Sequence, residues 1–185
     1  NRGNAKNGLK DYQGAIDDYS KAIEINPQDP DNYYNRGVVK LKDYQDSIAD
    51  FSKAIEINPQ HASAYSNRGI AKRRLKDYQG AIADYNKAIE IDPQNPDYYF
   101  NRGYAKDELR DYEGAIADYS KAIEINPQSA TAYSNLCNTK NNLKDYEGAM
   151  IDCSKALEIN PQSAMANNNR GNAKNGLKDY QGAID

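Results

Sequence analysis

The chain is poor in the residues that build a large hydrophobic core. Its 185 residues include no Trp, two Phe and two Met, and only 38% of them are hydrophobic. A single round core is hard to build from this composition, whereas an elongated array needs only thin interfaces between neighbouring units. The sixteen tyrosines are therefore expected to be mostly packing residues with a wetted hydroxyl.

Other absences narrow the class of partner. No apolar run approaches the length that spans a membrane, and no signal-peptide pattern is visible. The net charge is −3, and the 28% of charged residues interleave both signs, which argues against a nucleic-acid backbone as the main partner. We therefore expect neither a membrane nor a nucleic acid as partner.

Residues for catalysis or metal binding are also scarce. The one histidine, His61, stands in a turn between units and is predicted to be a surface residue that caps a helix. Cys137 and Cys153 have no metal-ligand spacing; they could lie near each other, but we expect buried free thiols in a reducing, cytoplasmic compartment. No phosphate-binding loop, Cys/His cluster or nucleophile–base pair is present. The sequence predicts no enzyme, no metal and no cofactor.

What the chain does have is a repeat. The string KAIEINPQ recurs, with prolines spaced 32, 34, 34 and 34 residues apart at Pro27, Pro59, Pro93, Pro127 and Pro161. This period predicts one array of helical units over residues 1–185. The units are a partial repeat 1–29, a short repeat 30–61, then 62–95, 96–129, 130–163 and a partial repeat 164–185.

Each unit follows the same pattern of two helices. In residues 96–129, Asn95 precedes a proline and starts a first helix that ends near Leu109, and Asn126 stops a second helix. Ser129 then caps the next unit. Second helices are predicted to begin at Asp11, Asp43, Asp77, Asp111, Asp145 and Asp179. Small residues mark close helix approach at Gly3, Gly37, Gly69, Gly103 and Gly171, and at Ala22, Ala54, Ala88, Ala122 and Ala156.

The phase of these residues resembles the tetratricopeptide repeat over the entire chain, through Tyr99, Gly103, Ala115, Tyr119, Ala122 and Pro127. The resemblance implies an all-α, right-handed superhelical solenoid of antiparallel helix pairs whose first helices line a concave groove. It also implies a protein-interaction scaffold or adaptor that binds a peptide or protein segment. The style of the repeats, with NRG and DYQGAI, is similar to bacterial arrays.

Two positions depart from the family pattern. Arg102 and its equivalents Arg2, Arg36, Arg68 and Arg170 replace a common Leu, and Lys106 and its equivalents replace a common Tyr. An aspartate recurs in each second helix, at Asp18, Asp50, Asp84, Asp118 and Asp152. We expect the arginines and aspartates to form a ladder of ion pairs along the stack, of modest energy if exposed.

The resemblance also implies which residues line the groove. They are Tyr34, Asn35, Val38, Ser66, Asn67, Ile70, Arg73, Arg74, Phe100, Asn101, Tyr104, Asp107, Glu108, Asn135 and Asn138. This face would offer an apolar centre beside a basic pair, an acidic pair and an Asn-rich stretch, which suits a peptide with an apolar anchor. Alternatively, Arg73 and Arg74 simply pair with Asp107 and Glu108. The Lys positions of the family's C-terminal carboxylate clamp hold Tyr34, Ser66, Phe100 and Ser134, so a receptor for chaperone tails is not expected.

Two units are irregular. Repeat 30–61 is two residues short, so either its first helix ends early, near Lys40, or the sequence is interrupted before Leu41. Repeat 130–163 diverges most, because Leu136 replaces Arg and Cys137 and Cys153 replace Gly and Tyr. Loss of aromatic area is expected to weaken its joint with the next unit.

Residues 1–17 recur identically as 169–185, which predicts a fragment of a longer protein whose ends favour end-to-end self-association. The alternatives to an adaptor are an array attached to an enzyme domain and a self-assembling structural array.

Overall fold

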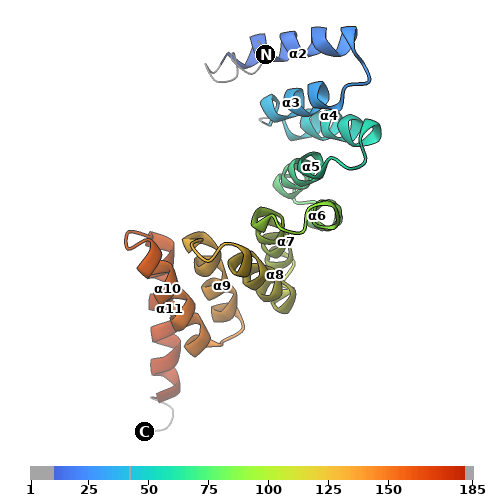
Figure 1. Cartoon of the computed structure of the whole chain (residues 1–185). Coiled ribbons are helices and arrows are strands. Elements are labelled where there is room, and N and C mark those ends of the chain that lie inside the picture. Colours follow the sequence, from blue (N-terminus) through green and yellow to red (C-terminus); the bar gives the residue numbers. More distant parts are fainter. Residues whose placement is uncertain (1–10, 42, 182–185) are drawn as a thin grey trace. The chain divides into compact units, whose positions relative to one another are not determined.

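The computed structural model describes residues 11–41 and 43–181, and within these ranges the chain forms α-helices and no strands (Figure 1). It divides into two compact units, unit 1 up to Pro93 and unit 2 from Gln94. Unit 1 contains α2 (Tyr12–Ile25), α3 (Pro30–Val39), α4 (Tyr44–Ile57), α5 (Ala62–Arg74) and α6 (Tyr78–Ile91). Unit 2 contains α7 (Pro96–Glu108), α8 (Tyr112–Ile125), α9 (Ala130–Asn142), α10 (Tyr146–Ile159) and α11 (Ala164–Gln181).

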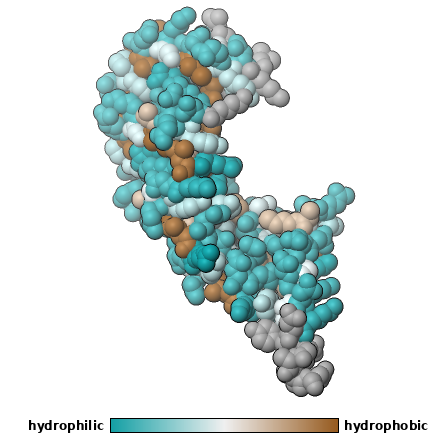
Figure 2. Space-filling view, turned by 180° about the vertical axis from the view of Figure 1, so that it is seen from behind, coloured by the Kyte–Doolittle hydropathy of each residue, from teal (hydrophilic) through white to brown (hydrophobic). Residues whose placement is uncertain are grey.

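Within each unit every helix packs on the next one along the chain, and short turns reverse the direction between them (Figure 1). The odd-numbered helices are the first helices of the repeats and the even-numbered ones are the second helices. The exposed side chains are mostly hydrophilic, interrupted by short apolar strips on the face that Figure 2 shows. This surface fits a chain whose apolar residues are used between helices.

The helix ends follow the predicted capping residues. The side chains of Asp11, Asp43, Asp77, Asp111 and Asp145 cap the five second helices by accepting backbone N–H bonds. First helices α5, α7 and α9 are capped by His61, Asn95 and Ser129, also as predicted. In the short repeat, α3 ends at Val39 and Lys40 is its C-cap, so the predicted early end is confirmed.

One predicted helix start is wrong. Asp179 lies inside α11, which continues to Gln181. In repeats 62–95, 96–129 and 130–163 a residue of positive φ, such as Lys144 at 63°, follows the first helix, and the next aspartate caps the second helix.

Close helix approach is confirmed at Gly37, Gly69 and Gly103, whereas a Cβ added to Gly171 would meet no heavy atom within 4 Å, so the approach predicted there is not found among the described residues. A Cβ added to Gly69 would lie 2.7 Å from Tyr85 Cε1, and one added to Gly103 would lie 3.1 Å from Tyr119 Cε1. Each glycine thus faces a buried aromatic ring across its helix pair, which leaves no room for a side chain. The predicted Gly3 lies outside the described residues.

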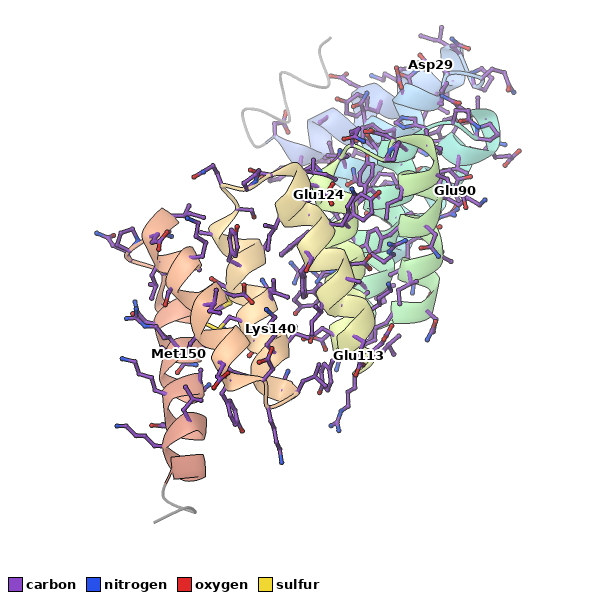
Figure 3. All side chains as sticks on the ribbon, turned by 60° about the horizontal axis from the view of Figure 1, so that its bottom comes forward. Asp29, Glu90, Glu113, Glu124, Lys140 and Met150 are labelled. Atoms are coloured by element: carbon purple, nitrogen blue, oxygen red, sulfur yellow. A yellow bond between two sulfur atoms is a disulfide. The ribbon has the colours of Figure 1, made fainter. Side chains whose placement is uncertain are left out.

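The two cysteines occupy this same glycine–aromatic position in repeat 130–163. Cys137 and Cys153 form a disulfide with a Cα–Cα distance of 5.4 Å, seen as the yellow bond in Figure 3. The prediction of free thiols is therefore wrong, because the glycine and aromatic positions face each other closely enough for two cysteines there to be joined. Cysteine usage consequently does not indicate a reducing compartment.

Candidate peptide-binding face

The arginines and lysines that depart from the family pattern form ion-pair networks with the aspartates of the second helices. Arg102 donates from Nε and Nη2 to both carboxylate oxygens of Asp118, at 2.9 and 2.5 Å. The same bidentate pair joins Arg36 to Asp50 and Arg68 to Asp84. The predicted ladder is confirmed in these three repeats, whereas Arg2 lies outside the described residues. The aspartates are not exposed, since the Asp118 side chain is 5% accessible.

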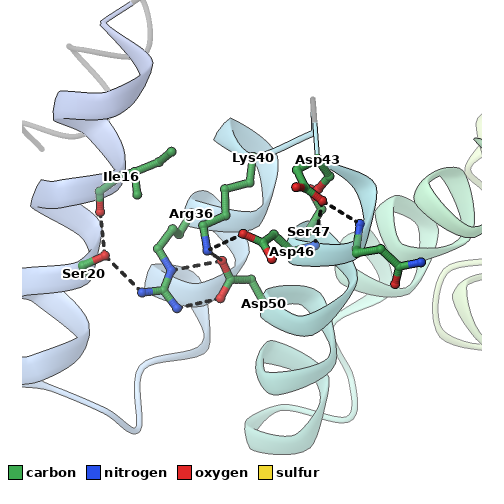
Figure 4. A network of polar contacts seen from close by, with 9 residues as sticks. Ile16, Ser20, Arg36, Lys40, Asp43, Asp46, Ser47 and Asp50 are labelled. Carbon is green, nitrogen blue, oxygen red and sulfur yellow. Dashed lines mark hydrogen bonds and ion pairs between the residues drawn. The ribbon is translucent and has the colours of Figure 1, made fainter.

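A lysine completes each network, and sequence reasoning missed it. Lys106 Nζ lies 2.8 Å from Asp118 Oδ2, so this buried carboxylate meets two cations. Lys72 pairs likewise with Asp84 at 2.8 Å, and Lys40 pairs with Asp50 at 3.1 Å (Figure 4). Each lysine follows its arginine by four residues, which places both on one face of the first helix. That spacing was the available signal.

The arginines also connect neighbouring repeats. Arg36 Nη1 donates to Ser20 Oγ on the preceding second helix at 3.1 Å (Figure 4), and Arg68 does the same to Ser52. The guanidinium of Arg36 lies 5.8 Å from the centroid of the Tyr33 ring, a cation–π distance. These charges therefore hold the helices together and are occupied within the scaffold.

Repeat 130–163 lacks half of this network. Because Leu136 stands in the arginine position, the ion pair that the described residues make to Asp152 comes from Lys140, at 2.6 Å. Burial raises the pKa of Asp152, and the hydrogen bond and charge of Lys140 act against that rise.

The predicted groove residues lie on the first helices, mostly half-buried. Arg74 and Glu108 are exposed, and Ser66 is buried at 5% accessibility. In unit 1, α3 and α5 bring Tyr34 and Asn67 together, because Asn67 Nδ2 donates to the Tyr34 hydroxyl at 3.1 Å. The Tyr34 ring also lies 4.7 Å from the His61 ring, centroid to centroid.

His61 is more covered than the sequence predicted. Its side chain is 15% exposed, and Nδ1 accepts the N–H of Ala64 at 3.3 Å. Its Nε2 lies 3.6 Å from Asp31 Oδ1. The capping role is confirmed, but the Tyr34 ring, together with the cap, covers a side chain that was expected on the surface.

In unit 2 the first-helix face is hollowed. A cavity of about 270 Å³ opens between the start of α7, the end of α8 and the start of α9. Phe100 lines it on the apolar side, and Asp97, Asn126, Ser129 and Thr131 supply polar groups. Phe100 and Tyr104 also pack against the buried cluster of Ala115, Tyr119 and Leu136. An apolar wall with a polar rim is the composition of a small side-chain pocket.

The charged groove residues have partners in their own units. Asp107 Oδ1 accepts from Thr139 Oγ1 at 2.9 Å, and burial raises the pKa of Asp107 while this bond opposes the rise. Burial raises the pKa of Tyr85 to about 12, and the nearby charge of Arg73 opposes that rise. Contact between the Arg73–Arg74 pair and the Asp107–Glu108 pair would join the two units, and it stays a prediction.

Polar contacts that the sequence did not reveal continue along unit 2. Asn141 Nδ2 donates to the carbonyl of Asn169 at 2.8 Å, and buried Asn169 donates to the carbonyl of Ser134 at 3.1 Å. The predicted Asn135 donates back to Thr131 O of its own helix at 2.9 Å. Asparagine side chains thus support α9 and α11 as well as facing outward.

The described residues contain neither a candidate metal-binding cluster nor a candidate membrane-spanning helix. No cluster of three or more His, Cys, Asp or Glu side chains in residues 11–41 and 43–181 could hold a metal ion. No helix in this part of the chain combines the length and apolar character needed to cross a membrane.

Comparison with known proteins agrees with this architecture. The family model described as TPR repeat matches residues 3–43, 38–75 and 71–107, and the one described as Tetratricopeptide repeat matches residues 96–129 and 130–163. The chain belongs to the tetratricopeptide repeat family. The predicted all-α solenoid of antiparallel helix pairs is thereby confirmed. No match was found among curated proteins.

Several solved structures are similar to the chain. A crystal structure of MamA is 25% identical over 89% of this chain and 97% of that chain, with a TM-score of 0.83. YrrB, described as a tetratricopeptide protein with an unusual peptide-binding site, is 21% identical over 89% of this chain and 86% of that chain, with a TM-score of 0.77. The first tetratricopeptide domain of Spaghetti, bound to the HSP90 peptide SRMEEVD, is 28% identical over 64% of this chain and 94% of that chain, with a TM-score of 0.63. The fold is that of a protein-interaction scaffold.

Proposed function

We propose that this chain is an adaptor that binds a peptide or protein segment along the face of its first helices. The cavity of about 270 Å³ in unit 2 is the observation that carries the proposal. Its apolar wall, formed by Phe100, suits one apolar anchor side chain, and the surrounding Asp97, Asn126 and Thr131 suit the backbone amides of an extended segment.

Two further observations support the proposal. In unit 1, the Tyr34–Asn67 contact places polar atoms of two first helices side by side on the predicted groove face. The internal arginines and their aspartates are already paired, so recognition falls to the residues that differ between repeats. The domain of Spaghetti bound to an HSP90 peptide provides an example of peptide binding by this fold.

The ligand differs from a chaperone tail in this proposal. The positions that hold clamp lysines in the family are Tyr34, Ser66, Phe100 and Ser134 here. A segment with an apolar anchor and uncharged or mixed-charge flanks therefore fits better than a terminal carboxylate. Self-association through the chain ends remains a separate prediction, which light scattering over a range of concentrations tests.

The proposal is tested with a peptide that is selected from a random library for binding to the full chain. Its affinity is then measured for the unaltered chain and for variants. Thr131→Arg and Asp97→Arg place long side chains at the cavity and should weaken binding at least tenfold. Lys121→Ala with Glu124→Ala removes an exposed ion pair on the second helix α8 and is the matched control, expected to leave binding unchanged. Equal affinity of the unaltered chain, Thr131→Arg and Asp97→Arg for the peptide would overturn the proposal.

A further inference from the structure

Three repeats seat one of the chain's own arginines in a slot between their two helices. In repeat 96–129 the slot is formed by the ring of Tyr99, 5.6 Å from the Arg102 guanidinium carbon, and by the buried carboxylate of Asp118. Arg36 and Arg68 are held in the same way over Tyr33 and Tyr65. An aromatic face beside a buried carboxylate is thus this chain's own recognition site for guanidinium.

Repeat 130–163 keeps the walls of the slot and lacks the arginine. Tyr133 and Asp152 occupy the positions of Tyr99 and Asp118, but residue 136 is leucine. Leu136 is 5% exposed and packs against Ala115 and Tyr119, so it fills the position of the arginine stem and brings no charge to Asp152.

A cavity borders both Tyr133 and Asp152. It has a volume of about 580 Å³, and its walls include Tyr133 of α9 and Met150, Ile151, Asp152 and Ser154 of α10. Ile151 is 69% exposed, an apolar side chain where the other repeats have Ala or Asp. Lys155 also lines the cavity, but its ammonium is paired with Glu158 at 2.7 Å.

We propose that this cavity binds the guanidinium group of an arginine side chain supplied by a partner protein. The guanidinium stacks on Tyr133 and donates to Asp152, the two contacts that the internal arginines make in the other repeats. The aliphatic stem of the ligand arginine packs on Met150 and Ile151.

Charge and burial favour this ligand over others. The Asp152 side chain is 10% exposed and, among residues 11–41 and 43–181, meets one cation, Lys140, where Asp50, Asp84 and Asp118 meet two. Burial raises the pKa of Asp152, as expected of a carboxylate that a second cation would stabilise. A planar guanidinium matches the flat ring and the two oxygens better than a lysine ammonium does.

The site is distinct from the first-helix face. Most of its walls come from the second helix α10, and it shares none of the predicted groove residues. A partner protein could bind at both sites, with an arginine at Asp152 and a separate segment at Phe100. Binding at each site can therefore be tested alone.

Amide chemical-shift titration of the full chain with N-acetyl-arginine amide tests the proposal. Shifts should gather at Tyr133, Ile151 and Ser154, and N-acetyl-citrulline amide, a neutral molecule of nearly the same shape, should bind at least tenfold more weakly. Leu136→Arg supplies the internal arginine that the other repeats have, so the variant should fold and should lose binding at least tenfold. Equal binding of citrulline, equal binding by the variant, or shifts spread over all repeats would each overturn the proposal.

Discussion

At the scale of single residues, the buried aspartates of the second helices determine where charge can be held. Asp118 is enclosed by Arg102 and Lys106, whereas its equivalent Asp152 is paired, among the described residues, with Lys140 alone. A buried charge is tolerated when its partners are complete, and removing one partner leaves the others uncompensated. The four complete repeats therefore offer matched sites that differ in one cation.

The first prediction compares these sites. Asp118→Asn leaves two cations without their carboxylate and should lower the free energy of unfolding by about 3–5 kcal/mol. Asp152→Asn leaves one cation and relieves a poorly compensated carboxylate, so its cost should be clearly smaller. Urea unfolding of the two variants measures the difference. Equal losses would show that the second cation contributes nothing.

The second prediction concerns pH. The folded-state pKa of Asp152 is raised, so its protonation favours the folded state, and stability is lost as pH rises from the unfolded pKa through the folded one. Leu136→Arg should lower the pKa of Asp152 and remove that loss. The variant should therefore gain more stability relative to wild type at pH 7 than at pH 3. Carboxyl carbon titration by NMR and unfolding at both pH values provide the test, and a gain independent of pH would contradict it.

How far the sequence predicts these contacts depends on the residue. The repeated phase of arginine and aspartate was sufficient to predict the ladder. The lysines were treated only as departures from a family pattern, although Arg102 and Lys106 stand four residues apart on one helix face. The disulfide was missed because the sequence does not show that the glycine and tyrosine positions face each other. The structure does, since a Cβ added to Gly69 would lie 2.7 Å from Tyr85 Cε1.

At the scale of helices, the two helices of a repeat pack closely because a small residue on the first faces a large side chain on the second. Gly103 faces Tyr119 as Cys137 faces Cys153, and both pairs are separated by 16 residues. The glycine–aromatic pair and the disulfide are therefore alternative fillings of one position. Changing one member alone disturbs the packing, whereas changing both can preserve it.

This equivalence gives the third prediction. The double variant Gly103→Cys with Tyr119→Cys should form a disulfide under oxidising conditions, because its backbone positions match those of Cys137 and Cys153. Mass spectrometry before and after reduction detects the bond. Gly103→Cys with Ser120→Cys is the out-of-register control and should remain reduced. A bond in the control but not in the matched pair would refute the equivalence.

The fourth prediction concerns the caps of second helices. A Cβ on Gly114 would lie 2.3 Å from Asp111 Oδ2, the side chain that accepts the Gly114 N–H. Gly114→Ala should therefore destabilise the protein by about 0.5–2 kcal/mol through the lost cap, although Gly→Ala inside a helix usually stabilises. The short repeat already has Asp46 at this position, with a different cap geometry, so Asp46→Ala is the control and should not show this loss. Thermal unfolding measures both.

Helix ends were predictable wherever a cap residue and a following partner helix are both present. Asp77 and Asp179 stand in the same string LKDYQGAI, yet Asp77 caps α6 whereas Asp179 lies inside α11. In unit 1, α6 packs against the first helix α5. Local sequence alone does not contain that information.

At the scale of the whole molecule, the repeats separate packing residues from recognition residues. The predicted groove residues are indeed on the first helices, and Phe100 lines a cavity among them. The cavity beside Tyr133 and Asp152 was not predicted from the family pattern, because that pattern does not contain the arginine–aspartate network. The proposed peptide binding depends on the cavity at Phe100, and the proposed arginine binding depends on the cavity at Tyr133 and Asp152.

The most direct test of the scaffold account is a map of where a selected peptide binds. Amide chemical shifts of the full chain, recorded with and without the library-selected peptide, give that map. The account predicts that the largest shifts lie on first helices, around Phe100 and Thr131 or around Tyr34 and Asn67. Shifts confined to outward faces of second helices, such as Lys121 and Glu124 of α8, would contradict it.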